Sequence, residues 1–307
     1  MACVAQRSLL GNFAMDIGRY GIWTFLDLLP AAASQAAVRE IESLGFGAVW
    51  IPEAVGREAF VHAGLLLAGS RSIVVATGIA NIYARDPMAM ASAQKTLAEA
   101  YPDRFLLGIG VSHQPLVQGV RGHNWTKPYT YMREYLDAMD SALFMAAQPA
   151  TPPERVLGAL HPKMLKLSAE RAGGAHPYFV TPEHTKRVRG IIGDGKLLAP
   201  EQAVLFETDP VKARAIARNH TATYTRLPNY RNNLLTLGFT AADFEAEGGS
   251  DRLVDAVVAW GSTEQIVARV QEHVAAGADH VCIQVLDENP IVAPVAQWQT
   301  LAKALRL

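Results

Sequence analysis

The chain has 307 residues, of which 50% are hydrophobic and 19% charged, and 28 Lys and Arg against 29 Asp and Glu leave a formal net charge of −1. This composition is typical of a folded globular protein, and the length can form one large α/β barrel or two medium domains, so it excludes disorder and a peptide-sized scaffold. Without a clustered basic excess, an extended nucleic-acid interface is not expected.

Short apolar or β-branched runs alternate with longer amphipathic stretches, a pattern that predicts βα units around a parallel sheet. In the first half of the chain, the apolar runs predict strands at 19–24, 47–51, 72–79 and 105–110. The amphipathic stretches predict helices at about 29–44, 59–68, 87–101 and 129–144. Gly45 suits the position after a helix, and Pro87 suits the first turn of one.

The second half of the chain continues the alternation. Its apolar runs predict strands at 155–160, 174–180, 202–207 and 280–286, although the proline within the second run is unfavourable for a strand. Helices are predicted at 163–172, 183–192, 209–219, 263–276 and 293–305. A long helical tract is expected through 231–237, 243 and 252–260, with an interruption at 248–250.

Eight strands, each followed by a helix, predict one (β/α)₈ TIM barrel domain over residues 1–307. The surplus length lies after the fourth and seventh strands, where we expect insertions, the larger being helical at about 220–260. A doubly wound open sheet with a helical second domain is the competing architecture.

Cysteine content and the termini bear on the compartment. Cys3 and Cys282 are far apart and form no C-x-x-C pair, which argues against a disulfide framework or a zinc knuckle and favours a reducing cytoplasm. The first ten residues do not read as a secretion signal. The longest stretch without Asp, Glu, Lys or Arg, 105–120, is too polar to span a membrane. We therefore expect an unanchored cytoplasmic protein.

Two turns after predicted strands could hold an anion. Gly108 and Gly110 would let backbone N–H groups approach a phosphate, although two glycines could equally relieve crowding between barrel strands, and neither G-x-G-x-x-G nor Walker A is present. His161 and Lys163 flank the proline that opens the next helix, whose N-terminus would favour negative charge. The alternative is an ordinary proline-initiated helix with a solvated lysine.

Segments 76–87, 102–110, 169–175 and 275–281 resemble the bacterial luciferase-like superfamily, in particular its deazaflavin branch, which uses coenzyme F420. The resemblance spans nearly the whole chain and implies a (β/α)₈ barrel with an insertion. It implies a non-prolyl cis peptide between Gly78 and Ile79, in a bulge beside Asn81 that supports the planar ring system of the cofactor.

The same resemblance implies a phosphate cradle. Its members would be the backbones of Val111, Ser112, Leu160 and His161, with Gly110 and Lys163 beside them. These are the two turns selected above on physical grounds, so the resemblance and the local chemistry predict the same cofactor site.

The chain departs from part of this family after the second strand. Sugar-phosphate and alcohol dehydrogenases of the branch carry an acid–His pair there, with His as a base, whereas this chain has Glu53 and Ala54. Such an activity is therefore disfavoured unless His113 or His184 substitutes for the base.

Two side chains are candidates for catalysis. His113 stands where relatives have a catalytic Glu, and an imidazole with an ordinary pKa near 6.5 could donate or accept a proton, unless it only bonds a loop backbone. Glu53 could orient substrate or act as an acid, or it could pair with Arg57 or Arg85. Candidate pocket walls are Tyr83, His176, Tyr178 and His184.

The predicted function is an oxidoreductase that transfers a hydride between F420 and an organic substrate. One alternative is an FMN-dependent luciferase-like monooxygenase, and another is a cofactor-binding barrel without turnover. A zinc hydrolase using Glu53, His113, His161, His176 and His184 has the wrong ligand spacing.

The segment 224–239 could cover the pocket, reach the anionic tail of the cofactor, or pack on the barrel wall or another subunit. Partners are a small molecule and, as an open possibility, a second copy in a homodimer.

Overall fold

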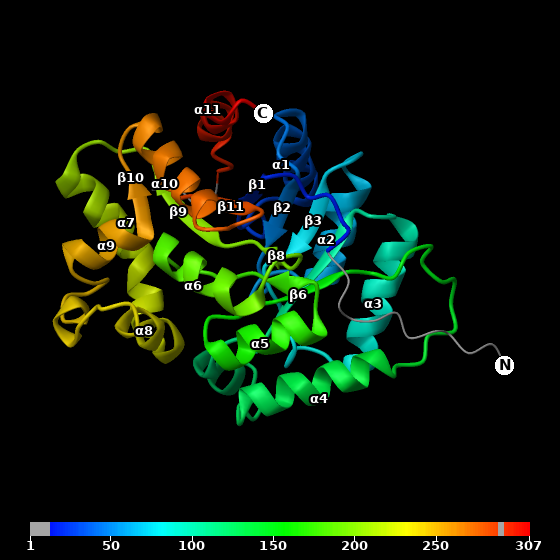
Figure 1. The fold of residues 1–307 in the computed structure, drawn as a ribbon. Helices are drawn as coiled ribbons and strands as arrows, with labels where there is room; N and C mark the ends of the chain where they lie inside the picture. The colour runs from blue at the N-terminus through cyan, green and yellow to red at the C-terminus, as the bar shows by residue number, and fades with distance from the viewer. Residues whose placement is uncertain (1–12, 288–291) are drawn as a thin grey trace.

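The structure is a computed structural model that describes residues 13–287 and 292–307. Its strands all pair in parallel, and helices surround the sheet (Figure 1). The strands are β1 Tyr20–Trp23, β2 Ala48–Ile51, β3 Val74–Thr77, β4 Ala80–Asn81, β5 Phe105–Gly110, β6 Arg155–Leu157, β7 Gly174–Ala175, β8 Leu197–Leu198, β9 Glu201–Leu205, β10 Val258–Trp260 and β11 Val281–Val285.

Helices follow most of these strands, as a βα alternation requires. They are α1 Ala31–Ser43, α2 Ala59–Ala68, α3 Pro87–Ala100, α4 Pro128–Asp140, α5 Pro162–Arg171, α6 Pro182–Ile192, α7 Pro210–Thr225, α8 Pro228–Leu235, α9 Asp251–Val257, α10 Thr263–Ala275 and α11 Val295–Leu305, with a π-helix at Pro115–Val120 and a 3₁₀ helix at Ala241–Phe244. In Figure 1, α7, α8 and α9 gather on the side of the molecule away from α3. No described helix combines the length and apolar character needed to cross a membrane.

The sheet follows the order β10, β9, β11, β1, β2, β3, β5, β6, β7, β8, with β4 beside β5. The short segment 199–200 separates β8 from β9. At one end of this segment β8 pairs with β7, and at the other end β9 pairs with β11. The parallel sheet therefore curls so that β8, at one end of its path, and β9, next to the other end, lie on one continuous stretch of chain.

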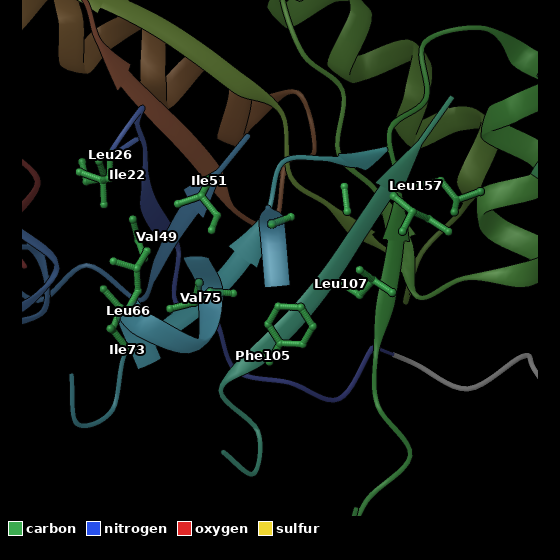
Figure 2. Close-up of a cluster of buried hydrophobic side chains, with 14 of the residues drawn as sticks. Ile22, Leu26, Val49, Ile51, Leu66, Ile73, Val75, Phe105, Leu107 and Leu157 are labelled. Carbon is green, nitrogen blue, oxygen red and sulfur yellow. The ribbon is translucent and has the colours of Figure 1, made fainter. Parts of the chain in front are cut away.

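Alternate residues of a strand pack in different clusters on the two faces of the sheet. On β2, Val49 and Ile51 pack in the large cluster between the strands and the surrounding helices, part of which Figure 2 shows, whereas Ala48 and Trp50 pack in a smaller cluster. The smaller cluster gathers residues of alternate positions from several strands, including Cys282 on β11. Because successive side chains of a strand point to opposite faces, the smaller cluster is the inward one.

Local sequence signals set several element ends. Gly45 follows α1 with φ of +89°, a conformation that glycine adopts without penalty. The side chain of Asp86 accepts a hydrogen bond from the backbone N–H of Ala89, and Pro87 occupies the first turn of α3. These predictions are confirmed.

Four sequence-based assignments are corrected. The predicted helix through 252–260 ends at Val257, because Val258–Trp260 forms strand β10 on β9. The predicted strand 174–180 is reduced to Gly174–Ala175, as its proline foreshadowed, and the strand predicted at 155–160 ends at Leu157. The third predicted strand, 72–79, is shorter and is followed by β4.

Candidate functional site

A bulge separates β3 from β4. The peptide bond between Gly78 and Ile79 is cis, as the family resemblance implied. Trp23 Nε1 donates a hydrogen bond to the Gly78 carbonyl at 3.1 Å. A Cβ at position 78 would lie 2.8 Å from Trp23 Nε1 and 3.0 Å from His176 Nε2, so only glycine fits between these two rings.

The glycines of β5 have a packing role. A Cβ on Gly108 would lie 2.0 Å from the Thr77 carbonyl oxygen, and one on Gly110 would lie 2.7 Å from Ile79 Cδ1. Thr77 Oγ1 also donates to the Gly108 carbonyl at 2.7 Å. The two glycines thus relieve crowding against the bulge, which was the alternative to a phosphate-binding role for this pair.

The turns after β5 and β6 adjoin one another. The backbone N–H of Gly158 donates to the Ile109 carbonyl at 2.8 Å, so the chain leaves both strands side by side. Ser112 has φ of +53°, which turns the backbone sharply. In the part of the chain that the structure describes, four backbone N–H groups of these turns donate no hydrogen bond; they belong to Val111, Ser112, Leu160 and His161.

The start of α5 adds to this group of free donors. His161 occupies the cap position, but its side chain does not cap the helix. Instead, its Nε2 lies 3.1 Å from the Asn229 carbonyl oxygen. Lys163 is exposed in the first turn. Free N–H groups at a helix start and a cation beside them make an environment that suits an anion.

His184 holds the turn after β6 through a side-chain hydrogen bond. It is fully buried, and its Nε2 lies 3.0 Å from the Leu160 carbonyl oxygen. Burial lowers the pKa of His184 to about 4, so the ring is neutral at pH 7. A neutral Nε2–H that donates to this carbonyl fixes the turn, which is a different place from the pocket wall that the sequence suggested.

His113 contacts the start of helix α8. Its ring centroid is 5.3 Å from that of Tyr230, and its side chain hydrogen bonds with that of Asn229. Burial lowers the pKa of His113, and the hydrogen bond to Asn229 opposes this effect. The start of α8 therefore contacts both turns, since Asn229 also meets His161.

Glu53 is engaged at both carboxylate oxygens. One oxygen forms an ion pair with Arg85, and the other accepts hydrogen bonds from Arg85 at 3.0 Å and from the backbone N–H of Asn81 at 2.7 Å. Arg85 also pairs with Glu58 at 2.7 Å. Of the two partners that the sequence offered, Arg85 is the one that Glu53 meets, whereas the side chain of Arg57 donates to Ser34. This arrangement anchors the bulge rather than presenting a free acid.

Three predicted wall residues lie in aromatic contacts. Tyr83 stacks on Tyr131 with centroids 4.6 Å apart, and its hydroxyl has no partner among the described residues. His176 stacks on Trp50 at 4.4 Å inside the sheet, and burial lowers its pKa to about 4. Tyr178 is half-buried, with its ring centroid 5.0 Å from that of Trp23.

A cavity of about 350 Å³ lies at the carboxyl ends of β1 and β11 and against α7, and Trp23, the neighbour of Tyr178, lines it. Its described lining consists of Trp23, Thr24, Phe25, Leu29, Ile216, Asn219, His220, Gln284, Val285, Leu286, Asp287, Val292, Ala293 and Pro294. None of these was predicted as a site residue, because the predicted site residues all follow or lie in the second to sixth predicted strands. The same rule applied to the first and last strands would have found Trp23 and Gln284.

Residues 13–287 and 292–307 contain no candidate metal-binding cluster. No three His, Cys, Asp or Glu side chains gather there in a way that could hold a metal ion.

Comparison with known proteins adds the evolutionary context. A Mycobacterium tuberculosis protein named as a coenzyme F420-dependent oxidoreductase is 29% identical over 175 residues. The matched region covers 47% of this chain and 50% of that relative's length. The 5,10-methylenetetrahydromethanopterin reductase of Archaeoglobus fulgidus is 25% identical over 80% of this chain and 86% of its own.

The fold is shared with a solved F420-dependent secondary alcohol dehydrogenase in complex with an F420-acetone adduct. The TM-score is 0.77 at 14% identity, over 94% of this chain and 99% of that one. Residues 19–192, more than half of the chain, match the luciferase-like monooxygenase family. This match contains the cis bulge and the two turns with free main-chain donors, and it shows that the chain belongs to the luciferase-like monooxygenase family.

Proposed function

We propose that this protein is an oxidoreductase that exchanges a hydride between coenzyme F420 and an organic substrate. The two curated relatives support this assignment, since one is named for F420 and the other is a reductase. When bound, the deazaflavin would supply or accept the hydride, and the protein would provide binding, orientation and exclusion of water.

The observation that carries the proposal is the set of unpaired main-chain donors. Four N–H groups, from Val111, Ser112, Leu160 and His161, lie in the two turns where β5 and β6 end, and Lys163 follows in the first turn of α5, whose start has no side-chain cap. Half-exposed backbone donors without a protein partner are satisfied by water or by a ligand. A phosphate fits this chemistry, and these residues would hold that of the cofactor tail.

Other residues would position the ring and its surroundings. Gly78, Ile79 and Asn81 would support the ring from the bulge, and Glu53 would hold Asn81 in place through its backbone N–H. His113 would face the reacting centre as a neutral imidazole, able to donate or accept a proton. Glu53 thus acts as a positioning residue, because Arg85 and Asn81 occupy its oxygens.

The architecture that we propose is a complete (β/α)₈ barrel in one domain. The meeting of β7, β8, β9 and β11 on one segment supports closure. The stretch from β5 to β6, which holds the π-helix and α4, and the stretch from α7 to β10, which holds α8 and α9, would be the insertions after the fourth and seventh barrel strands.

Parallel titrations with F420 and FMN test the function. F420 should bind at least tenfold more tightly, and Lys163→Ala should weaken its binding roughly three- to tenfold through loss of a cation beside the phosphate. Lys166→Ala, an exposed position on the same helix, is the matched control and should change nothing. Tight binding and turnover with FMN but not with F420 would reject the proposal in favour of a flavin monooxygenase.

Turnover separates an enzyme from a cofactor carrier. With F420 bound, an enzyme should change the absorbance of the cofactor in the presence of at least one member of a broad panel of carbonyl and alcohol compounds, whereas a carrier would not. Light scattering on the same samples tests for the homodimer.

A further inference from the structure

We infer that the cavity between β1, β11 and α7 binds the substrate, and that this substrate is an uncharged, largely apolar organic molecule whose oxygen atom accepts a hydrogen bond from the side-chain amide of Gln284. This inference rests on the proposed function, because it names the substrate class of the same reaction. Three features of the cavity carry it.

The first feature is the place of the cavity. Trp23 is the last residue of β1 and Gln284 lies near the end of β11, and these two strands pair directly. The cavity thus opens at the carboxyl edge of a parallel sheet, where such folds bind ligands. Trp23 links it to the bulge, because the same indole lines the cavity and donates to the Gly78 carbonyl. A volume of about 350 Å³ suits a small molecule.

The second feature is the charge of the wall. No lysine or arginine belongs to the described lining, and its single ionised group, Asp287, is negative. His220 adds no positive charge, since burial lowers its pKa to about 4. Most of the remaining wall is apolar, from Phe25 and Ile216 to Val285 and Leu286. A carboxylate or phosphate would lose its hydration here without gaining a cation.

The third feature is the orientation of Gln284. Its side chain is 5% exposed, and Oε1 accepts a hydrogen bond of 2.8 Å from the Tyr178 hydroxyl. That hydroxyl lies 2.9 Å from the hydroxyl of Tyr224, which completes a chain of three side chains. Burial keeps the pKa of Tyr178 well above 10, so the phenol remains a donor at ordinary pH.

Of the three hydrogen-bonded side chains Gln284, Tyr178 and Tyr224, only Gln284 keeps a donor for a ligand. With Oε1 occupied, the Nε2 amide group of Gln284 is available, and among the described residues it donates to no acceptor. A group that donates but does not accept selects a carbonyl or ether oxygen, or a hydroxyl acting as acceptor. If the substrate is a carbonyl compound, the same donor would also meet the oxygen that gains negative charge when a hydride arrives at its carbon.

Binding of simple probes to the cofactor-free protein tests the inference by calorimetry or ligand-observed NMR. Cyclohexanone should bind, and cyclohexanecarboxylate, of similar size, should bind at least tenfold more weakly. Gln284→Leu should weaken cyclohexanone binding about tenfold, as expected for loss of one buried hydrogen bond. Tyr178→Phe should have a smaller effect, because it frees the amide without removing it. Gln299→Leu, an exposed glutamine on α11, is the control and should have none.

Each result decides the inference. Equal binding of the ketone and the carboxylate, no binding of either, or an unchanged affinity in Gln284→Leu would overturn it. Should Gln284→Leu fail to fold, Ile216→Trp provides a second route, because a larger side chain on the α7 wall should block cyclohexanone without touching Gln284. Because F420 is absent, failure here is distinguishable from failure of the proposed function, which the cofactor titrations report separately.

Discussion

The guanidinium of Arg85 forms an ion pair with the carboxylate of Glu53, whose side chain is only 3% exposed. The same Nη2 atom of Arg85 also pairs with Glu58, an exposed carboxylate, and the hydroxyl of Tyr135 donates to the Arg85 carbonyl. Loops after β2 and β4 are tied together through this arginine. The ion pair with Arg85 gives Glu53 a structural role after β2, at a place where the next residue, Ala54, cannot act as a base.

Glu53→Gln should consequently lower stability before it affects chemistry. Loss of the negative charge leaves Arg85 largely buried beside one exposed partner, which we expect to reduce the free energy of unfolding by about 3 kcal/mol in urea denaturation. Glu58→Gln is the control and should cost at most about 1 kcal/mol, as for an exposed pair. If Glu53→Gln instead retained full stability and lost hydride transfer, the catalytic role first considered for Glu53 would be restored.

The glycines of β5 should respond to substitution in a defined order. Gly108→Ala places a methyl group against the backbone oxygen of Thr77, which cannot move without breaking β3, so the variant should be strongly destabilised or fail to fold. Gly119→Ala, in the π-helix, meets no atom within 4 Å and should leave the melting temperature nearly unchanged. A tolerated Gly108→Ala would show that the bulge is looser than described.

Gly110→Ala should be intermediate, because its new methyl group meets the side chain of Ile79 instead of backbone. We expect a loss of about 1–3 kcal/mol, as for other overpacked sites. The double variant with Ile79→Ala should recover part of this loss, and a double-mutant cycle measures the coupling. Additive losses would mean that Ile79 is not what excludes a side chain at 110.

These contacts also show how far the sequence could predict the molecule. Periodicity and caps located most elements, because Asp86, Pro87 and Gly45 act through neighbouring residues. Strand β10 was missed because Val258–Trp260 takes its conformation from pairing with β9, which no local pattern encodes.

The same division applies to the site. The turns after β5 and β6 were identified from glycine, proline and lysine nearby. The partner of Glu53 and the orientation of Gln284 depend on Arg85 and Tyr178, which are 32 and 106 residues away along the chain. Such long-range pairings determine the chemistry of a side chain and are invisible to local reasoning.

Glu201 should make stability decrease toward alkaline pH. It is fully buried on β9, and burial raises its pKa to about 8, although a hydrogen bond from the Phe179 backbone N–H opposes this. Above an unfolded pKa near 4.5 the unfolded chain has released this proton while the folded protein retains it. The free energy of unfolding then falls as pH rises to about 8, by about 1.4 kcal/mol per unit for this group.

Glu201→Gln removes the contribution of this carboxyl to the pH dependence of stability. Relative to the native protein, the variant should gain stability between pH 5 and 8 when urea unfolding is compared across pH. The exposed Glu245→Gln should show the native pH dependence. A parallel pH dependence in Glu201→Gln and the native protein would mean that Glu201 is ionised when folded.

Buried histidines act in the opposite direction. Burial lowers the pKa of His176, His184, His220 and His280 to about 4 and that of His273 to about 3, and His273 is held between Thr185 and Gln202. Below pH 6.5 the unfolded chain binds protons that the folded protein excludes, so stability falls as pH decreases toward 4.

The two effects together predict a stability maximum at about pH 7, where the proton uptake of the unfolded histidines and the proton retained by folded Glu201 balance. On its acid side the buried histidines together outweigh the single carboxyl, whose contribution has the reverse sign, and on its alkaline side Glu201 dominates because the histidines are nearly neutral in both states. Urea unfolding at half-unit steps from pH 5 to 9 measures the curve. In Glu201→Gln the alkaline decline should become shallower while the acid decline steepens, because the opposing term is gone. A maximum at or above pH 8 in the native protein would contradict the buried, protonated state of Glu201.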